Sequence, residues 1–506
     1  MSNSPLEAIL GKDVQAGMGA HMSNWCTGRA IGQDGRFTPI VSGIALDLVL
    51  ARELQDGDLT GDIRKALNAF QEIYDVPDEF VQEVLDEYFL EDGRQGENYK
   101  HMSPPKFTQT PNPDDSTKQI LTLDNTREKL LVLGGFVEVY RAKQGHDSPI
   151  GVNFLNKIAW PLLPGVYGVM LAEAYFVAIG AGFKKGIPQA LDNLSKGEVA
   201  SLPFDVIQDD TGEINTNYSF AFDPSVVMGR TVKSTRPGYI AIIGNHLGLN
   251  KTSDADGLVF EMPPAGGHNA PARVREPCPN NEPAYSHKDE IDWSKTSKKI
   301  DDRPFWLAGG SAERRTEALY RGAQGTQVGT AFAFCADETG MDSDLRDKAL
   351  EAIMNGAYVL TDPNISPSGF PFKVLMLDGT IADDDVGGVR SNRQRRCDLQ
   401  YLVDFYINED GDKVKMRCPA EPVKSYVEKG GSQQNAIDRA CLCNALMSTV
   451  KFPSIMPNGE LEPPVITAGK DLSLVRELVI RYGDPTNGNY DYSAKQVIDS
   501  LEQKNK

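Results

Sequence analysis

The sequence predicts a (β/α)8 TIM barrel that carries an inserted helical segment, a hairpin and a C-terminal α-rich extension. Short apolar runs alternate with amphipathic helical stretches between residues 13 and 328, which favours a parallel sheet covered by helices. Eight such runs are present, and eight parallel strands close into a barrel. We therefore expect the barrel to start at residues 1–56, an insertion at 57–149, the rest of the barrel with its hairpin at 150–340, and the extension at 341–506.

The composition is that of an ordinary globular protein. Of its 506 residues, 40% are hydrophobic and 24% charged, and the formal net charge is −19. This acidity argues against nucleic acid or an anionic membrane as a partner. Residues 161–183 are apolar, but Pro164, Gly165 and Glu173 predict a loop, a short helix and a strand rather than a membrane span. The N-terminal residues show no secretory signal pattern, and the odd number of cysteines, seven, favours a reducing compartment, so we expect a cytoplasmic protein.

The first two strands are expected at Asp13–Met18 and Pro39–Ser42, each followed by a helix. The turn after the first strand, QAGMG at 15–19, is rich in glycine. The charged segment 57–149 then interrupts the alternation. Apolar residues at helical spacing between Phe70 and Tyr88 predict helices there, which we expect to cap the mouth of the barrel, and clustered prolines predict a loop around His101–Asp115.

The alternation resumes with four further short apolar runs. They predict strands at Ile150–Phe154, Tyr175–Ile179, Tyr239–Ile243 and Leu258–Glu261. Two more runs, Phe204–Ile207 and Tyr218–Phe222, are separated by the polar stretch DDTG at 209–212 and by no helix. They are therefore expected to form an inserted hairpin.

The last two strands, Phe305–Ala308 and Gly325–Val328, each end in small residues: Gly309-Gly310 and Gly329-Thr330. A helix between them is expected to be capped by Ser311 and to carry Thr316, Leu319, Tyr320 and Ala323 at the i, i+3, i+4, i+7 spacing of one helix face. Free N–H groups at two such junctions favour phosphate binding, and in (β/α)8 barrels the phosphate site is often built from these loops. The alternative is that the glycines serve packing alone.

His268 lies in a proline- and glycine-rich loop, MPPAGGH at 262–268, directly after a predicted strand. Barrel enzymes keep their chemistry at this end of the strands, and a histidine there can serve as a general base. The alternative is a loop histidine with a structural hydrogen bond. His21 and His246 also follow predicted strands, and they remain candidates for the same pocket.

These segments together resemble the FMN-dependent nitronate monooxygenases, also called 2-nitropropane dioxygenases. The resemblance rests on QAGMG at 15–19, GVNF at 151–154, AGGH at 265–268, LAGG at 307–310 and VGT at 328–330. It implies that His268 is the catalytic base. It also implies that FMN is held by Gly309, Gly310, Gly329 and Thr330 at its phosphate and bordered by Gly17, Met18, Asn153, Gly266 and Gly267 at its ring.

The implied activity is flavin-dependent oxidation of alkyl nitronates or nitroalkanes by O2, giving a carbonyl compound and nitrite. The partners would then be a small nitro compound and O2, and a homo-oligomer is possible. Related flavin barrels act as FMN-dependent enoyl reductases in fatty-acid or polyketide pathways, which is the second interpretation. A flavin-binding protein that has lost catalysis is the third. The additional segments of this chain leave the physiological substrate open.

The extension holds the remaining signals. A loop at Thr361–Phe370 is placed to close over the pocket. Four cysteines, Cys397, Cys418, Cys441 and Cys443, suit zinc or an iron–sulfur cluster in residue type, but their spacing is wide and no C-x-x-C pair occurs. Buried free thiols are the preferred interpretation, and no metal is assigned.

Overall fold

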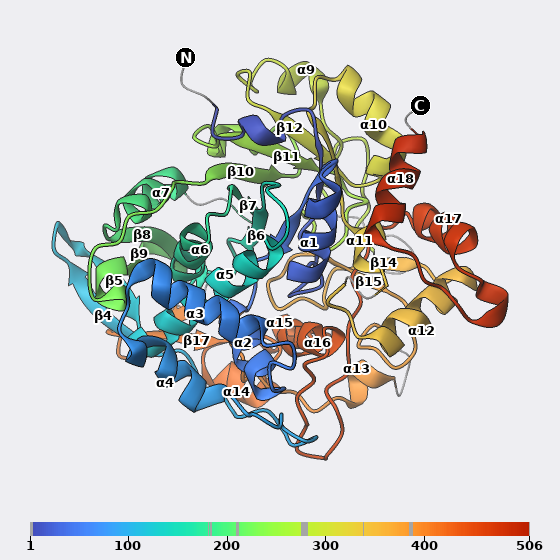
Figure 1. The fold of residues 1–506 in the computed structure, drawn as a ribbon. Coiled ribbons are helices and arrows are strands. Elements are labelled where there is room, and N and C mark those ends of the chain that lie inside the picture. The colour runs from blue at the N-terminus through green and yellow to red at the C-terminus, as the bar shows by residue number, and fades with distance from the viewer. Residues whose placement is uncertain are drawn as a thin grey trace.

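The computed structural model describes residues 4–180, 182, 185–208, 212–274, 282–336, 339–383 and 388–504 (Figure 1). Within these ranges nine strand segments form one parallel sheet in the order β2-β1-β13-β12-β11-β10-β7-β6-β3. They are β1 (Asp13–Gln15), β2 (Phe37–Thr38), β3 (Ile40–Ser42), β6 (Gly151–Leu155), β7 (Phe176–Gly180), β10 (Gly238–Ile243), β11 (Gly257–Glu261), β12 (Phe305–Ala308) and β13 (Gly325–Val328).

The sheet closes because its two end segments are halves of one strand. β2 and β3 are separated only by Pro39, which has no N–H to donate to the ladder. Its carbonyl still accepts a hydrogen bond from Gly151 N at 2.9 Å. Counted this way, the described residues form eight parallel strands at the eight predicted positions, so the predicted (β/α)8 TIM barrel is confirmed.

The inside of the barrel is a packed core. It contains Val14, Ile40, Phe176, Ala178, Ile240, Val259, Trp306 and Ala308, together with Leu6 and Ile9 from the start of the chain. Leu6 closes the N-terminal end of the strands: a side chain added at Gly238 or Gly257 would lie 2.4 Å or 2.6 Å from its methyl carbons. Since this end is filled, a ligand site is left to the opposite end.

Helices cover the outside of the barrel. α6 (Leu162–Leu171) and β7 account for the apolar stretch 161–183, as predicted, and no helix among the described residues is long and apolar enough to cross a membrane. The remaining helices around the strands are α1 (Trp25–Asp34), α2 (Leu46–Gln55), α5 (Asn125–Ala142), α7 (Ile187–Lys196), α8 (Pro224–Met228), α9 (Trp293–Thr296), α10 (Ser311–Tyr320) and α11 (Thr330–Ala333).

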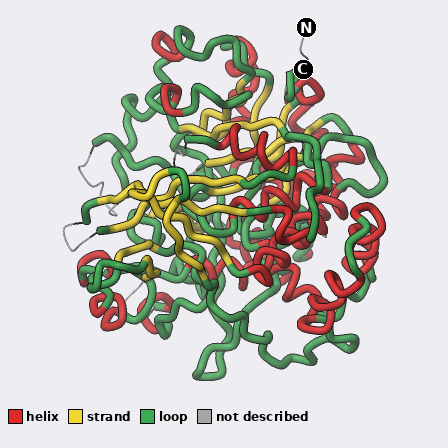
Figure 2. The backbone as a smooth tube through the Cα atoms, turned by 90° about the vertical axis from the view of Figure 1, so that its left-hand side faces the viewer, coloured by secondary structure: helices red, strands yellow, loops and turns green. Residues whose placement is uncertain are grey.

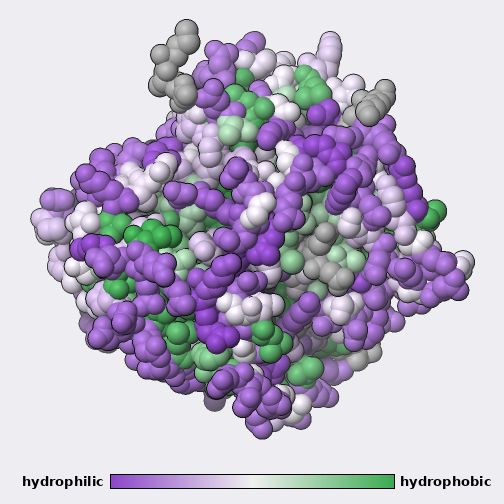
Figure 3. Space-filling view, viewed as in Figure 1, coloured by the Kyte–Doolittle hydropathy of each residue, from purple (hydrophilic) through white to green (hydrophobic). Residues whose placement is uncertain are grey.

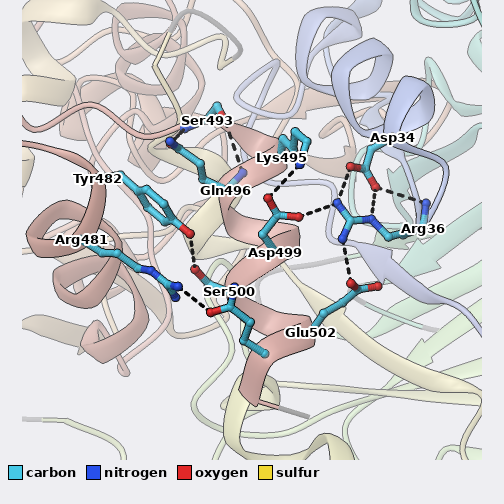
Figure 4. A network of polar contacts seen from close by, with 11 residues as sticks. Asp34, Arg36, Arg481, Tyr482, Ser493, Lys495, Gln496, Asp499, Ser500 and Glu502 are labelled. Carbon is cyan, nitrogen blue, oxygen red and sulfur yellow. Dashed lines mark hydrogen bonds and ion pairs between the residues drawn. The ribbon is translucent and has the colours of Figure 1, made fainter. Parts of the chain in front are cut away.

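The last helix of the chain, α18 (Ala494–Lys504), belongs to the same outer layer, because it packs against α1 and α10. Arg36, just after α1, fastens it: its guanidinium lies 2.7 Å from Asp499 Oδ1 and 2.7 Å from Glu502 Oε2, and 2.6 Å from Asp34 Oδ2 (Figure 4). Residues more than 450 positions apart are thereby joined by one cation.

A second sheet gathers strands from the insertion, the hairpin and the extension. Its order is β17-β16-β8-β9-β5-β4. The hairpin is confirmed, as β8 (Ala200–Ile207) and β9 (Ile214–Phe222); residues 209–211 of its turn lie outside the described residues. The other strands are β4 (Phe107–Asn112), β5 (Asp115–Leu123), β16 (Asp404–Ile407) and β17 (Val414–Arg417). Figure 2 shows strands running through the left and centre, with many helices on the right.

Two expectations for the insertion are wrong. The segment predicted as a loop around His101–Asp115 contains the strand β4. This strand is mostly polar and lies at the edge of the second sheet, and it is hydrogen-bonded to β5. Helices α3 (Asp62–Tyr74) and α4 (Asp78–Tyr88) are present, but they pack on α5 and α2 rather than over the mouth, and no described residue of the insertion lines the cavity found there.

The extension is rich in helices, as predicted, and also contributes short strands. Its helices are α12 (Ser343–Met354), α13 (Val389–Asn392), α14 (Val423–Glu428), α15 (Gln433–Ala436), α16 (Leu442–Thr449), α17 (Ser473–Tyr482) and α18. A two-stranded sheet of β14 (Val359–Asp362) and β15 (Phe372–Leu375) holds the loop between them against the barrel, since His268 and Phe372 form an antiparallel bridge.

Candidate functional site

A cavity opens at the C-terminal ends of the barrel strands. All ten residues assigned from the resemblance line it: Gly17, Met18, Asn153, Gly266, Gly267, His268, Gly309, Gly310, Gly329 and Thr330. They lie on or just after five different strands, β1, β6, β11, β12 and β13, and the closure of the barrel brings them together. Their individual roles remain predictions.

Several glycines on this cavity have no room for a side chain. A Cβ at Gly329 would lie 2.7 Å from Met18 Sδ, and one at Gly17 would lie 2.4 Å from Asn153 Cβ. At Gly309, φ is +89°, and a Cβ would approach Ala265 N to 2.9 Å. The cavity is therefore bordered by closely packed backbone, which suits a ligand recognised through N–H groups.

The start of α10 departs from the expectation. Gly310, with φ +67°, occupies the cap position, and Ser311 is the first helical residue. The left-handed turn extends one residue further than predicted, because two glycines permit it. Of the four residues at the predicted spacing, Ala323 is buried, whereas Thr316, Leu319 and Tyr320 are exposed. Ala318 is buried instead, so the predicted face is wrong at three of its four positions.

Arg314 adds a positive charge to this end of the cavity, and sequence reasoning missed it. Its Nε lies 3.9 Å from where a Cβ on Gly310 would be, and its Nη1 hydrogen-bonds Met262 Sδ at 3.2 Å. Among the described residues no carboxylate pairs with it. A guanidinium beside a glycine cradle, without a counter-charge, suits an anionic phosphate group.

His268 is held by the extension. Its Nε2 lies 2.7 Å from Ser366 Oγ, and its ring meets Phe372 edge-on at 4.7 Å between centroids. The loop predicted to close over the pocket, Thr361–Phe370, thus provides the contact that orients the ring. Burial, with a smaller effect of the charge on Lys157, lowers the pKa of His268 to about 4, so the imidazole is neutral near pH 7.

A second pair of titratable groups lies near this loop. Glu261, at the end of β11, lines the cavity, and burial raises its pKa to about 7. Lys373 is fully buried, donates to Asn269 Oδ1, and has its pKa lowered to about 7 by burial. Both groups therefore titrate near neutral pH. Asn269, to which Lys373 donates, is the residue that follows His268.

The extension also supplies an apolar wall, which sequence reasoning did not predict. Leu402, Leu446 and Met447 line the cavity together with Tyr401 and the barrel residue Ile158. Thr467 and Gly469 close it from another side: Gly267 N donates to Thr467 Oγ1 at 2.9 Å, and Gly469 N donates to Thr330 Oγ1 at 2.8 Å. The cavity is complete only with this part of the chain.

The two other candidate histidines do not line the cavity. His21 is buried between carboxylates, with Nδ1 3.6 Å from Glu138 and Nε2 4.0 Å from Glu53. His246 is also buried, and burial lowers its pKa. Both are better explained as structural residues, and neither can reach a ligand in this cavity without rearrangement.

The four cysteines of the extension come together in one buried cluster. Cys418 and Cys441 are its core, and Cys397 and Cys443 pack against them. Although the thiols converge, no group of three or more histidine, cysteine or acidic side chains among the described residues is arranged to hold a metal ion.

No protein-family model and no curated protein sequence matches the chain. Solved structures similar to it include FabK from Thermotoga maritima, at 13% identity and a TM-score of 0.42, covering 100% of this chain and 96% of that one. A nitroalkane oxidase from Streptomyces ansochromogenes has 11% identity and a TM-score of 0.37, covering 98% and 96%. The enoyl reductase domain of MlnA from Bacillus amyloliquefaciens has 10% identity and a TM-score of 0.38, covering 75% of this chain and 85% of that one. Because these scores are all below 0.5, the barrel is assigned from its own strand order.

Proposed function

We propose that this chain binds FMN in the cavity and oxidises alkyl nitronates or nitroalkanes with O2 to a carbonyl compound and nitrite. One observation carries the proposal. Tightly packed glycine backbone after β1, β11, β12 and β13 lines a single cavity that also contains a neutral histidine. Arg314, which has no carboxylate partner among the described residues, lies beside the cavity residue Gly310. The motifs that resemble the nitronate monooxygenases are the segments that make this cavity.

The residues present fit FMN. Gly309, Gly310, Gly329 and Thr330, with Arg314, would hold its phosphate, since a Cβ at Gly309 or Gly329 would collide with neighbouring loops and the guanidinium has no carboxylate partner among the described residues. Gly17, Met18, Asn153, Gly266 and Gly267 would border the ring. When bound, FMN would supply the electron-accepting group that the side chains themselves lack.

His268 is assigned the proton-transfer step. Its Nε2 can donate its proton to Ser366 Oγ, whose hydroxyl then donates to Ser368 Oγ at 2.7 Å. This arrangement leaves the Nδ1 lone pair, which no described protein atom hydrogen-bonds, to accept the acidic proton next to a nitro group. Ser366 is therefore a positioning residue that sets the tautomer.

Enoyl reduction is the second candidate, and the apolar wall favours it. Leu402, Leu446 and Met447 extend the cavity with surface that an acyl chain can contact, which a small nitroalkane does not need. A flavin-binding protein without catalysis is the remaining alternative. It predicts bound flavin with no turnover of any of these substrates.

The decisive experiment is an absorbance spectrum of the purified protein, repeated under anaerobic conditions with a nitronate. We expect a flavin spectrum that bleaches on addition of the nitronate, and release of FMN on denaturation. Release of FAD would contradict the cofactor assignment. Bleaching by NADPH but not by the nitronate, with reduction of an enoyl thioester, would establish the second candidate instead.

A further inference from the structure

A strap from the extension, residues 464–470, borders the cavity, and the proposed reaction does not use it. Val465, Ile466 and Ala468 on this strap are fully buried. Leu375 N donates to Ile466 O at 2.9 Å, which ties the strap to β15. The strap is therefore a firmly packed part of the extension.

The strap joins the loops after two strands that are not neighbours in the barrel. Gly267 N, after β11, donates to Thr467 Oγ1 at 2.9 Å. Gly469 N donates at 2.8 Å to the Oγ1 of Thr330, which follows β13. Because β12 pairs with both of these strands, the strap connects the two sides of the loop after β12, where the FMN phosphate is expected.

The strap and the loop after β11 are in close contact. A Cβ on Gly266 would lie 2.9 Å from the carbonyl carbon of Ala468. A Cβ on Gly469 would lie 3.1 Å from Pro264 O, which also accepts a hydrogen bond from Lys470 N at 3.0 Å. The φ of Gly469 is outside the left-handed region, so this position lacks a side chain because of the contact and not because of a turn.

The two hydrogen bonds leave a hydroxyl hydrogen free at each threonine. Thr467 is 1% exposed, and its Oγ1 accepts from Gly267 N but donates to no described residue. Thr330 Oγ1 likewise accepts from Gly469 N and donates to no described residue. A buried hydroxyl normally donates its hydrogen as well as accepting one. Since both threonines line the cavity, they can donate to an acceptor on a bound ligand.

We propose that Thr467 is a further cofactor-binding residue, which donates its hydroxyl hydrogen to bound FMN, and that Gly469 positions the Thr330 hydroxyl to do the same. The strap then retains the cofactor, because its hydrogen bonds to the loops after β11 and β13 must break before those loops can separate. This inference rests on the proposed function, since it takes FMN as the ligand of the cavity.

The test compares the rates at which FMN dissociates from FMN-loaded variants, followed by flavin fluorescence after dilution. Thr467→Val keeps the shape of the side chain but removes the hydroxyl, so we expect dissociation roughly 10-fold faster, the effect of one lost hydrogen bond. Thr467→Ser keeps the hydroxyl and should dissociate at the parent rate. Gly469→Ala places a methyl group 3.2 Å from Thr330 Oγ1 and should also release FMN faster. The control, Thr296→Val, removes the hydroxyl of a fully buried threonine on α9 that does not line the cavity, and it should match the parent.

Two outcomes would overturn this inference alone. One is an unchanged rate for Thr467→Val, and the other is an equally fast rate for Thr467→Ser, which would assign the effect to the methyl group. A protein that takes up no FMN would overturn the proposed function and this inference with it. If a variant does not fold, hydrogen exchange on the parent protein decides the question. Peptides that cover residues 464–470 should exchange more slowly with FMN than without it, and equal exchange would contradict the role of the strap.

Discussion

At the scale of single residues, a substitution of His268 tests proton removal separately from the rest of the reaction. A nitroalkane must lose a proton before oxidation, whereas its nitronate has already lost it. His268→Asn keeps a polar side chain but no base near neutral pH. We expect retained FMN, a loss of roughly 10²–10⁴-fold in turnover of the nitroalkane, and nearly unchanged turnover of the nitronate. Steady-state rates with both substrate forms check this, and equal losses on both would assign His268 to positioning.

The same residue sets an expectation for acidic pH. Burial and Lys157 lower the pKa of His268 to about 4, so the base stays deprotonated between pH 8 and pH 5. The kcat/KM for the nitroalkane should therefore decline only as pH approaches 4. Lys157→Met removes the positive charge and should move this decline to higher pH. A parent profile that already falls near pH 6.5 would show that His268 is less buried in the working enzyme.

A substitution at Gly329 tests whether the glycine-rich loops after β12 and β13 hold the FMN phosphate. The Cβ position of this glycine is 2.7 Å from Met18 Sδ and 3.0 Å from Ala16 Cβ, so Gly329→Asp introduces both a collision and a negative charge where a phosphate is expected. We expect complete loss of flavin from the purified protein, measured as the ratio of absorbance at 450 nm to 280 nm. Gly229→Asp is the control and should retain the flavin, because Gly229 is exposed, nothing lies within 4 Å of its Cβ position, and its left-handed φ of +68° is one that Asp tolerates better than most residues.

At the scale of elements, one buried carboxylate, Asp47, links two helices to the extension. Asp47 on α2 is fully buried and accepts hydrogen bonds from Arg127 Nη1 at 2.8 Å and Tyr401 Oη at 2.7 Å. Tyr401 in turn stacks on Trp160, with ring centroids 5.3 Å apart. One carboxylate therefore joins α2, α5 and a residue on the wall of the cavity.

Removal of this carboxylate should be strongly destabilising. Asp47→Ala leaves the guanidinium of Arg127 without its charge partner in a largely buried place, which typically costs about 3–5 kcal/mol. We expect this loss in the free energy of unfolding from urea titration. Tyr401→Phe, which leaves the ion pair intact, should cost only about 1–2 kcal/mol. Equal costs for the two variants would mean that the hydroxyl, not the charge pair, holds the extension.

At the scale of the whole molecule, buried carboxyls shape the pH dependence of stability. Burial raises the pKa of Glu138 to about 8, so the native state keeps this proton where the unfolded chain, with a pKa near 4.5, has lost it. The contribution of Glu138 to the free energy of unfolding therefore becomes less favourable as pH rises from about 4.5 to about 8. We expect Glu138→Gln to gain stability relative to the parent over this range, by thermal or urea unfolding at pH 5 and pH 8. A constant difference at both pH values would contradict the assignment.

The surface is consistent with the composition. The face in Figure 3 is mainly hydrophilic, with small separate hydrophobic patches, and the net charge of −19 favours solubility. Nothing on that face contradicts the expectation, drawn from charge alone, that nucleic acid is not a partner. The homo-oligomer considered from sequence remains a prediction.

The sequence by itself determined the barrel and the residues on its working end. Each strand is a short local run of apolar residues, and glycine-rich turns follow directly in the chain, so both signals are contained in neighbouring positions. All eight strands were found in this way, and the ten cavity residues were assigned from the resemblance of these turns to a known family. The local details at α10 were wrong because two glycines allow a longer left-handed turn than a capping serine requires.

Only the tertiary structure decided what surrounds that working end. The second sheet pairs β5 with β9 and β8 with β16, joining segments that are separated by about 100 to 200 residues. Ser366 on His268 and the apolar wall from the extension depend equally on contacts between distant parts of the chain. A local pattern carries no information about such pairings, because their free energy comes from burial and hydrogen bonds that form only after the chain has folded.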